Sequence, residues 1–381
     1  MNFKALRDFQ DFLTSWRVSG CDCEVRVAQE TVHRYRSGYA DFEEKRLMRG
    51  DEFYYLWSSS KVITAALALK LYEEGRFLLT DPLSAYAPEF AEMQVFEEQS
   101  DGTRILRPAK KPILVRDLFT MSAGFDYNLE SDAIREVIRA KNGHATARDM
   151  LSAFAKHPLY FEPGERWSYS ACHDVLGGFI ELISGKRLRD YAREAIFEPL
   201  GMTDTSYGTP SRADFAERMM KQYIFDDATE SRKIEYGEPS HILTPDYDSG
   251  GAGVVSTVDD YITFADAMAS GGVAKNGERI LTAATIDLMR SDFLGERRKD
   301  MTWSQLTGYS YGLGVRTLVD RVSAGSLGPC GEFGWQGAAG TYVIIDPENR
   351  VAVFFAQQMR NSQEPYIAPR LRNHVYACLG R

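Results

Sequence analysis

The spacing of apolar positions predicts two helices of different character within the first 75 residues and another helix at the C-terminal end. Residues 1–16 place apolar side chains at helical spacing among charged ones, which predicts an amphipathic helix. From about residue 58 to residue 74 the chain is apolar on every side of a helix, so this segment is expected to be buried. Gly75 provides a natural stop for that helix. A last helix is predicted over residues 367–379.

Alternating apolar and polar positions predict strands near both ends. Residues 23–27 and 31–36 alternate on either side of a short polar turn, which predicts a β-hairpin, and residues 53–56 form a short strand or an extended lead. Further strands are predicted over residues 309–315, 319–324, 341–346 and 351–357, and the last two are joined by a turn at 347–350. This order of elements predicts an antiparallel sheet covered by helices.

The middle of the chain has short helical patterns broken by prolines and few strand patterns. Helices are expected over residues 115–121, 145–157 with a possible Thr146 cap, 174–183 before Gly185, and 188–197. Residues 204–245 are polar and irregular, the glycine-rich residues 249–253 predict a close-packed turn, and helices follow over 257–268 and 283–290. We therefore predict a discontinuous sheet domain of residues 1–79 and 246–381, interrupted by a mainly helical domain of residues 80–245.

Composition narrows the possible partners. The chain is 44% hydrophobic and 26% charged, as in ordinary globular proteins, and its formal net charge is -9. That charge argues against nucleic acid or an anionic membrane as a partner, because both require a basic surface. No apolar run reaches the ~18 residues of a membrane span, and the first helix does not resemble a signal peptide. We expect a cytoplasmic protein, or a periplasmic one if the sequence is that of a processed form.

The cysteines suggest neither disulfides nor a metal. All five are scattered along the chain, so we expect free thiols in a reducing compartment. Cys172, His173 and Asp174 are consecutive and would point in different directions, which does not suit a metal site. We expect neither a metal nor a cofactor.

A hydroxyl and an amine stand three residues apart at the start of the buried helix. Ser58 and Lys61 would share one helical face, so the ammonium can reach the hydroxyl one turn away. This geometry suits a serine activated by a lysine, and Ser-x-x-Lys is a known catalytic motif. About one such spacing is expected by chance in a chain of this composition. A serine that caps a buried helix is therefore the simpler interpretation, unless other residues complete a site.

Two further segments could complete a site for nucleophilic acyl transfer, which requires a base and oxyanion donors. Tyr169 lies in a loop just before the helix predicted at 174–183. A phenol acts as a base only if cations lower its pKa, and Lys61 could supply that charge. Residues 333–341 are glycine-rich and precede a strand, so their N–H groups could approach a ligand closely. Taken alone, the first is more simply a packing residue and the second a β-bulge or strand entry.

Taken in order, these segments resemble the serine β-lactamase and penicillin-binding protein superfamily, in the branch of class C β-lactamases and family VIII carboxylesterases. The resemblance spans nearly the whole chain, and its most specific stretch is FEPLGMTDT at residues 197–205. Other matching segments lie at residues 38–41, 73–75, 81–82, 118–124, 169–170, 174–177, 250–257 and 346–347. The resemblance implies a β-lactamase-like fold of the α+β class, with an antiparallel sheet flanked by helices and a mainly helical insertion.

The resemblance also implies roles for individual residues. Ser58 would be the nucleophile, Lys61 its activating amine, and Tyr169 the general base that also serves deacylation. The backbone N–H groups of Ser58 and Ala338 would form the oxyanion hole, where loss of one donor typically costs about 2.7–4 kcal/mol of barrier. The reaction would form an acyl-Ser58 intermediate that water then hydrolyses.

Two departures from the family pattern bear on the substrate. Ala171 stands where β-lactamases and peptidases carry an asparagine that binds an acylamino group. Trp335 stands where they carry a lysine or histidine that pairs with a substrate carboxylate. The esterase-like members often have tryptophan there, which favours neutral, apolar acyl groups. Gln336 and Gly337 complete the predicted substrate-binding segment, and Gln336 is unusual at its centre.

We therefore predict a serine carboxylesterase that acts on small-molecule esters of small or apolar acyl groups, with some capacity to transfer the acyl group to an alcohol. An alternative within the same class is a weak β-lactamase or a D-amino-acid peptidase, which would act on amides. An alternative of another class is a non-catalytic binding protein on the same fold. The presence of Ser58, Lys61 and Tyr169 together argues against that last alternative, because binding alone does not require all three.

Overall fold

An eight-stranded antiparallel sheet is built from both ends of the chain. The computed structural model describes residues 1–235 and 239–380, so residues 236–238 of the predicted insertion lie outside it. The strand order is β11-β12-β13-β14-β15-β1-β2-β3, and the two ends of the chain meet where Val25 of β1 lies opposite Val353 of β15. The strands are β1 (Gly20–Val27), β2 (Glu30–Asp41), β3 (Arg46–Leu47), β11 (Tyr309–Tyr311), β12 (Arg316–Leu318), β13 (Phe333–Gly334), β14 (Tyr342–Asp346) and β15 (Val351–Gln357).

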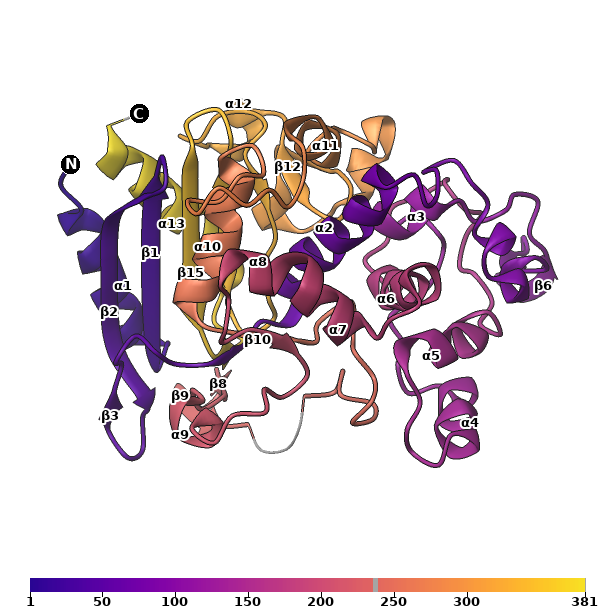
Figure 1. Cartoon of the computed structure of the whole chain (residues 1–381), viewed down its shortest axis with the longest axis horizontal. Helices are drawn as coiled ribbons and strands as arrows, with labels where there is room; N and C mark the ends of the chain where they lie inside the picture. The colour runs from indigo at the N-terminus through magenta and orange to yellow at the C-terminus, as the bar shows by residue number, and fades with distance from the viewer. Residues whose placement is uncertain (236–238, 381) are drawn as a thin grey trace.

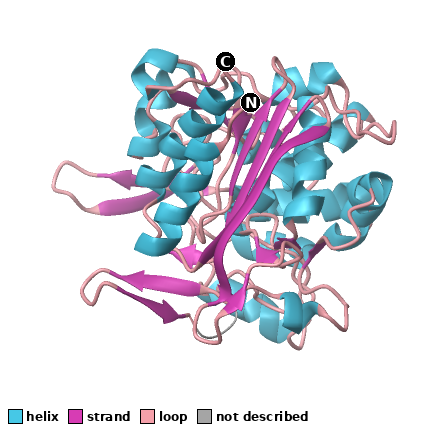
Figure 2. Cartoon of the chain, turned by 90° about the vertical axis from the view of Figure 1, so that its left-hand side faces the viewer, coloured by secondary structure: helices cyan, strands magenta, loops and turns pink. Residues whose placement is uncertain are grey.

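Helices cover both faces of this sheet (Figure 2). Helices α1 (Lys4–Trp16) and α13 (Glu364–Leu379) pack on one face, where they bury Val353 and Phe355 of β15. Helix α10 (Val258–Ala269) packs on the other face, against Ala352 and Phe354. Because both faces of β15 are covered, its sequence is almost continuously apolar. The two termini lie near each other beside this sheet (Figure 1).

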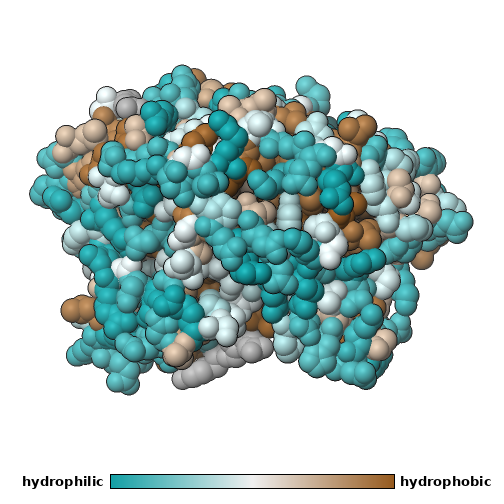
Figure 3. All heavy atoms as spheres, viewed as in Figure 1, coloured by the Kyte–Doolittle hydropathy of each residue, from teal (hydrophilic) through white to brown (hydrophobic). Residues whose placement is uncertain are grey.

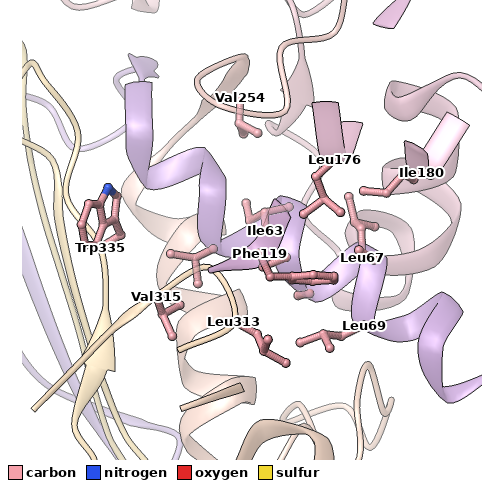
Figure 4. Close-up of a cluster of buried hydrophobic side chains, with 14 of the residues drawn as sticks. Ile63, Leu67, Leu69, Phe119, Leu176, Ile180, Val254, Leu313, Val315 and Trp335 are labelled. Atoms are coloured by element: carbon pink, nitrogen blue, oxygen red, sulfur yellow. The ribbon is translucent and has the colours of Figure 1, made fainter. Parts of the chain in front are cut away.

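Helix α2 (Ser60–Glu73) runs through the interior between the sheet and the helical middle of the chain (Figure 1). A 3₁₀ turn, η1 (Trp57–Ser59), leads into it, and Gly75 follows its end with a φ of +71°. Figure 4 shows Ile63, Leu67 and Leu69 of α2 among apolar side chains from other elements, including Phe119, Leu176 and Leu313. This surrounding explains why the helix is apolar on every side.

The middle of the chain is mainly helical and, within the described residues, adds no strand to the eight-stranded sheet. Its helices are α3 (Val115–Phe119), α4 (Asp132–Ala140), α5 (Ala147–Phe154), α6 (Cys172–Ser184), α7 (Leu188–Ala192), α8 (Glu198–Leu200) and α9 (Phe215–Arg218). Thr146 caps α5 through its side chain, and Gly185 ends α6 in the left-handed conformation, as the sequence predicts. The boundaries of the two predicted domains stay a prediction.

Several short strands in the middle of the chain were not expected from its pattern. Strands β5 (Gln94–Glu98) and β6 (Arg104–Pro108) form a hairpin, and β8 (Tyr223–Asp226) pairs with both β9 (Ser231–Ile234) and β16 (Met359–Arg360). The short strand predicted at residues 53–56 is confirmed as β4 (Tyr54–Tyr55), and it forms a small sheet with two unexpected strands far along the chain, β10 (Val254–Ser256) and β7 (Ser206–Tyr207). These strands are too short or too exposed to show a clear alternation of apolar residues.

Of two strands predicted near the C-terminal end, one is shorter than expected and the other is wrong. The strand predicted over residues 309–315 ends at Tyr311, because Gly314 adopts a φ of +84° in a turn that reverses the chain into β12. The strand predicted over residues 319–324 is a short helix, α12 (Arg321–Ala324), because the Asp320 side chain accepts hydrogen bonds from the N–H groups of Val322 and Ser323. The helix predicted over 283–290 is confirmed as α11 (Ala283–Met289).

The polar surface and the free cysteines are those that the composition predicts. The face shown in Figure 3 is largely hydrophilic, with hydrophobic residues in scattered recesses. All five cysteines are free. Within the described residues, no helix has both the length and the apolar character that crossing a membrane requires.

The burial of α2 predicts a large loss of stability when its core side chains are shortened. Leu67 is fully buried, so Leu67→Ala should lower the free energy of unfolding by about 2–5 kcal/mol through lost apolar contact and a residual cavity. Chemical denaturation followed by circular dichroism measures this change. Leu78→Ala is the matched control, because that side chain is 58% exposed and its loss should cost less than about 0.5 kcal/mol. Equal effects of the two substitutions would contradict the assigned core.

Candidate active site

Ser58 lies in the 3₁₀ turn that opens the buried helix α2. Its neighbour Trp57 has a φ of +50°, and the Trp57 indole N–H donates to the Gln222 side chain at 2.9 Å. The Trp57 ring also meets His241 edge-on, with ring centres 4.9 Å apart. These contacts hold the turn, while the Ser58 side chain stays partly exposed where α2 begins.

Lys61 is completely buried one turn along the helix from Ser58. Its ammonium donates to Ser58 Oγ at 3.2 Å, to Tyr127 Oη at 3.1 Å and to the Gly251 carbonyl at 2.7 Å. No carboxylate of the described residues forms a salt bridge with it. Its charge is therefore balanced by neutral oxygens and by the faces of Tyr127 and Tyr169, whose ring centres lie 5.3 and 4.8 Å from Nζ.

Tyr169 reaches the same serine from the loop before α6. Its hydroxyl donates to Ser58 Oγ at 2.5 Å, and the Trp335 indole N–H donates to Tyr169 Oη at 3.4 Å. The Tyr169 ring is stacked on Tyr127 and on Trp335, with ring centres 5.6 Å away in both cases. The structure thus brings Ser58, Lys61 and Tyr169 into direct hydrogen-bond contact.

Tyr127 is a member of this cluster that the sequence did not indicate. It lies in an irregular segment just after residues 118–124, and only that neighbouring motif could have drawn attention to it. Burial, together with the charge of Asp174, raises the pKa of Tyr127 well above its ordinary value. Tyr127 therefore stays a neutral phenol that can accept a hydrogen bond from Lys61.

Asp174 supports the carbonyl that Lys61 contacts. This buried carboxylate accepts hydrogen bonds from Tyr247 Oη at 2.9 Å, Ser249 Oγ at 2.6 Å and the Gly251 N–H at 3.3 Å. A side chain at position 251 would collide with Asp174 and crowd the Tyr127 hydroxyl. Glycine is therefore required where this loop passes between them, which explains the predicted close-packed turn.

The segment of residues 335–338 forms another wall of the site. Thr341 ties it to the serine turn by donating to the Leu56 carbonyl at 2.9 Å, and a side chain at Gly337 would collide with that carbonyl. Ala338 is exposed, and within the described part of the chain its backbone N–H has no hydrogen-bond partner. The N–H of Ser58 lies in the first turn of a helix, where such groups lack intrahelical partners.

Two cavities open on either side of Ser58. One, of about 370 Å³, is lined by Tyr169, Trp303, Trp335, Gln336, Ala338 and Glu364. The other, of about 430 Å³, is lined by Trp57, Tyr127, Leu129, Tyr169, His241 and Ala338. Ala171 lines neither of these, because its side chain is buried immediately before α6. An extended molecule bound across Ser58 could place one arm in each cavity.

Two buried histidines lie close to Lys61 without contacting the serine. Burial and the Lys61 charge lower the pKa of both His173 and His241 to about 3. His173 Nε2 lies 3.3 Å from the Phe119 carbonyl. Both rings are therefore neutral at ordinary pH. Among the described residues, no group of three His, Cys, Asp or Glu side chains is arranged to hold a metal ion.

Known proteins share sequence or overall fold with this chain. The sequence profile of the β-lactamase family matches residues 10–376. Protein Rv1367c of Mycobacterium tuberculosis is 30% identical over 90% of this chain and 86% of its own length, and esterase EstB of Burkholderia gladioli is 27% identical over 89% and 85%. The solved structure of EstCE1, titled a hydrolase with promiscuous acyltransferase activity, superposes with a TM-score of 0.79 at 24% identity, covering 98% of both chains.

The buried histidines predict that stability falls in mild acid. An unfolded histidine binds a proton below about pH 6.5, whereas His241 in the folded chain stays neutral down to about pH 3. The unfolded state therefore gains protons as the pH falls from 6.5 towards 3. Each such histidine should reduce the free energy of unfolding by about 1.4 kcal/mol for each pH unit in that range.

Denaturant titrations of His241→Gln at pH 7, 6, 5 and 4 measure this contribution. The variant should lose less stability on acidification than the unaltered chain does. His144→Gln provides the same substitution at a side chain that is 68% exposed, and serves as the control. An unchanged slope in the His241 variant would show that this ring takes up its proton in the folded state.

Proposed function

Because the chain belongs to the β-lactamase family and is a serine hydrolase, we propose that it hydrolyses esters of small or apolar acyl groups through an acyl-Ser58 intermediate. The observation that carries the proposal is the double contact of Ser58 Oγ, with Lys61 Nζ at 3.2 Å and Tyr169 Oη at 2.5 Å. A serine needs such neighbours to lose its proton as it attacks a carbonyl.

In the first half of the reaction, Ser58 Oγ attacks the ester carbonyl carbon. Its proton passes to the Tyr169 oxygen, which can accept it only after Tyr169 has released to solvent the proton that it donates to Ser58 in the structure. The positive charge of Lys61 would stabilise the negative charge on Tyr169 in this step, since its ammonium lies 4.8 Å from the Tyr169 ring centre and also contacts Ser58 directly. When the tetrahedral intermediate collapses, Tyr169 returns the proton to the departing alkoxide, and the acyl group stays on Ser58.

The negative charge that develops on the carbonyl oxygen must be stabilised by hydrogen-bond donors. The backbone N–H groups of Ser58 and Ala338 would supply them, and the absence of another hydrogen-bond partner for Ala338 N–H in the described residues supports this role. Water then attacks the acyl carbon, its proton passes to Tyr169, and Ser58 leaves as the free hydroxyl. If an alcohol takes the place of water, the same steps transfer the acyl group to that alcohol.

The surroundings of the site support an ester with an apolar acyl group. Trp335 is buried beside Tyr169, and Leu129 and Ala252 line the second cavity, so this region offers apolar contact in place of a cation for a carboxylate. Esterase EstB, whose name states its activity, is a relative over most of the chain. A weak β-lactamase or D-amino-acid peptidase remains the alternative within this class.

Replacement of the proposed nucleophile provides the main test. Ser58→Ala should lower turnover of p-nitrophenyl esters by about 10 000-fold or more, because no acyl-enzyme can form. Mass spectrometry after treatment with a fluorophosphonate should show one label on the unaltered protein and none on the variant. Esters of increasing acyl length, nitrocefin and D-alanyl peptides in the same assay distinguish an esterase from a β-lactamase or a peptidase.

Ser152→Ala is the control for that experiment, because Ser152 is exposed on α5 and should label and react like the unaltered protein. If Ser58→Ala keeps full esterase activity, the proposed function fails. A protein that takes no label and turns over no substrate would instead be the non-catalytic binding protein.

A second substitution tests the proposed base. Tyr169→Phe keeps the ring stacked between Tyr127 and Trp335 but removes the hydroxyl that contacts Ser58. We expect kcat for p-nitrophenyl acetate to fall by about 100- to 10 000-fold with little change in thermal stability. Tyr72→Phe, near the other end of α2, is the control and should keep normal kcat. Normal turnover in Tyr169→Phe would assign proton transfer to Lys61 alone.

A further inference from the structure

The cavity of about 370 Å³ beside Ser58 has an aromatic wall that the proposed chemistry does not by itself require. The Tyr169 ring centre lies 5.1 Å from that of Trp303 and 5.6 Å from that of Trp335, and the two tryptophans are 6.3 Å apart. Trp303 is 37% exposed, so this wall extends from the buried Trp335 to the cavity mouth. Clustered aromatic faces of this kind attract cations as well as apolar groups.

A side-chain oxygen without a hydrogen-bond donor lines the same cavity. Gln336 is only 8% exposed, and its side-chain carbonyl oxygen has no hydrogen-bond partner. A buried amide oxygen in this state carries a desolvation cost unless a bound molecule supplies a donor or a positive charge. Gln336 is the residue for which the sequence offered no role, and its position beside Ser58 now provides one.

Glu364 brings a carboxyl group to this cavity, and that group is negatively charged at a pH above its pKa. It is the first residue of α13, and no basic side chain of the described residues forms a salt bridge with it. Its carboxylate accepts a hydrogen bond from its own backbone N–H. The charge of the Arg360 guanidinium acts on Glu364 and lowers its pKa, but the salt bridge of Arg360 is with Glu235 at 2.7 Å. Burial raises the pKa of Glu364 to about 7.

We propose that this cavity binds a positively charged ammonium group of the substrate, held between the aromatic faces of Trp303 and Trp335, the Glu364 carboxylate and the Gln336 side-chain oxygen. Aromatic faces, a carboxylate outside any salt bridge of the described residues and an amide oxygen without a donor all present negative electrostatic potential to one space. A neutral chain could use the aromatic wall but would leave the Gln336 oxygen without a donor.

The alcohol portion of the ester is the part that occupies this cavity. This assignment rests on the proposed function, in which Tyr169 returns a proton to the departing alkoxide. The alkoxide must therefore lie beside Tyr169, whose neighbours Trp303 and Trp335 form the aromatic wall. The acyl group then extends towards the second cavity, past Leu129 and Ala252. The preferred substrates are thus esters of an ammonium-bearing alcohol with a small or apolar acid.

A pair of matched thioesters tests this inference. Acetylthiocholine carries a quaternary ammonium in the thiol portion, and S-(3,3-dimethylbutyl) thioacetate has the same shape with carbon in place of nitrogen. At pH 8 and low ionic strength, we expect kcat/KM to be about tenfold higher for the cationic thioester. The released thiol is measured with a disulfide reagent against a blank that contains the protein alone.

Glu364→Gln identifies the residue responsible, because it keeps the shape of the side chain and removes its charge. The ratio of the two kcat/KM values, cationic over neutral, should fall by about fivefold. Glu348→Gln makes the same change in net charge at the exposed turn between β14 and β15, and should leave the ratio unaltered. Trp303→Leu should also lower the ratio, since it keeps apolar contact but removes an aromatic face.

The possible results separate this inference from the proposed function. If the unaltered protein hydrolyses both thioesters through Ser58 with equal kcat/KM, the ammonium site is wrong and the esterase remains. If a preference exists but Glu364→Gln leaves it intact, the assignment to this cavity is wrong. If Ser58→Ala hydrolyses both thioesters normally, the proposed function itself fails.

Discussion

The burial of one ammonium group sets the conditions that the rest of the site must satisfy. Lys61 lies on α2, and its side chain is completely buried. Burying a charge costs several kcal/mol of folding free energy unless oxygens or opposite charges surround it. The chain meets this cost with Ser58, Tyr127 and the Gly251 carbonyl, together with the face of Tyr169. The residues that stabilise the charge are thus the same ones that place it against the serine.

This arrangement also explains why so much of the protein lies around α2. The helix can be buried only because the sheet, formed by both ends of the chain, lies on one side and the helical middle on the other (Figure 4). The groups that contact Ser58 and Lys61 come from both the helical middle and the loop that follows it. Tyr127 and Tyr169 come from the middle of the chain, and Gly251 comes from the loop that leads back to the sheet. The site therefore lies at the boundary between the two halves of the fold.

The proposed division of the substrate between two cavities follows from the same geometry. Ser58 opens on both sides, and the walls differ in chemistry: one is aromatic and carries Glu364, whereas the other offers Leu129 and Ala252. We therefore expect that changes in these wall residues alter which ester is bound, without altering the groups that contact Ser58. Trp335 is such a residue, because its indole both lines the cavity and contacts the Tyr169 hydroxyl.

The sequence by itself determined the features that depend on neighbours along the chain. Helical spacing places Lys61 one turn from Ser58, period-two alternation gives the hairpin of β1 and β2, and the apolar run of α2 requires burial. The order of motifs along the chain indicated that Tyr169 and residues 335–338 belong to the same site as Ser58.

Tertiary structure alone decided that Tyr127 contacts Lys61, that Asp174 holds the Gly251 loop, and that Gln336 and Glu364 face one cavity. It also ended the strand predicted at 309–315 after Tyr311, at a glycine turn, and replaced the strand predicted at 319–324 with a short helix that an aspartate caps. The reason is physical: periodicity records which face of an element is buried, whereas the partner it meets there depends on how distant segments pack.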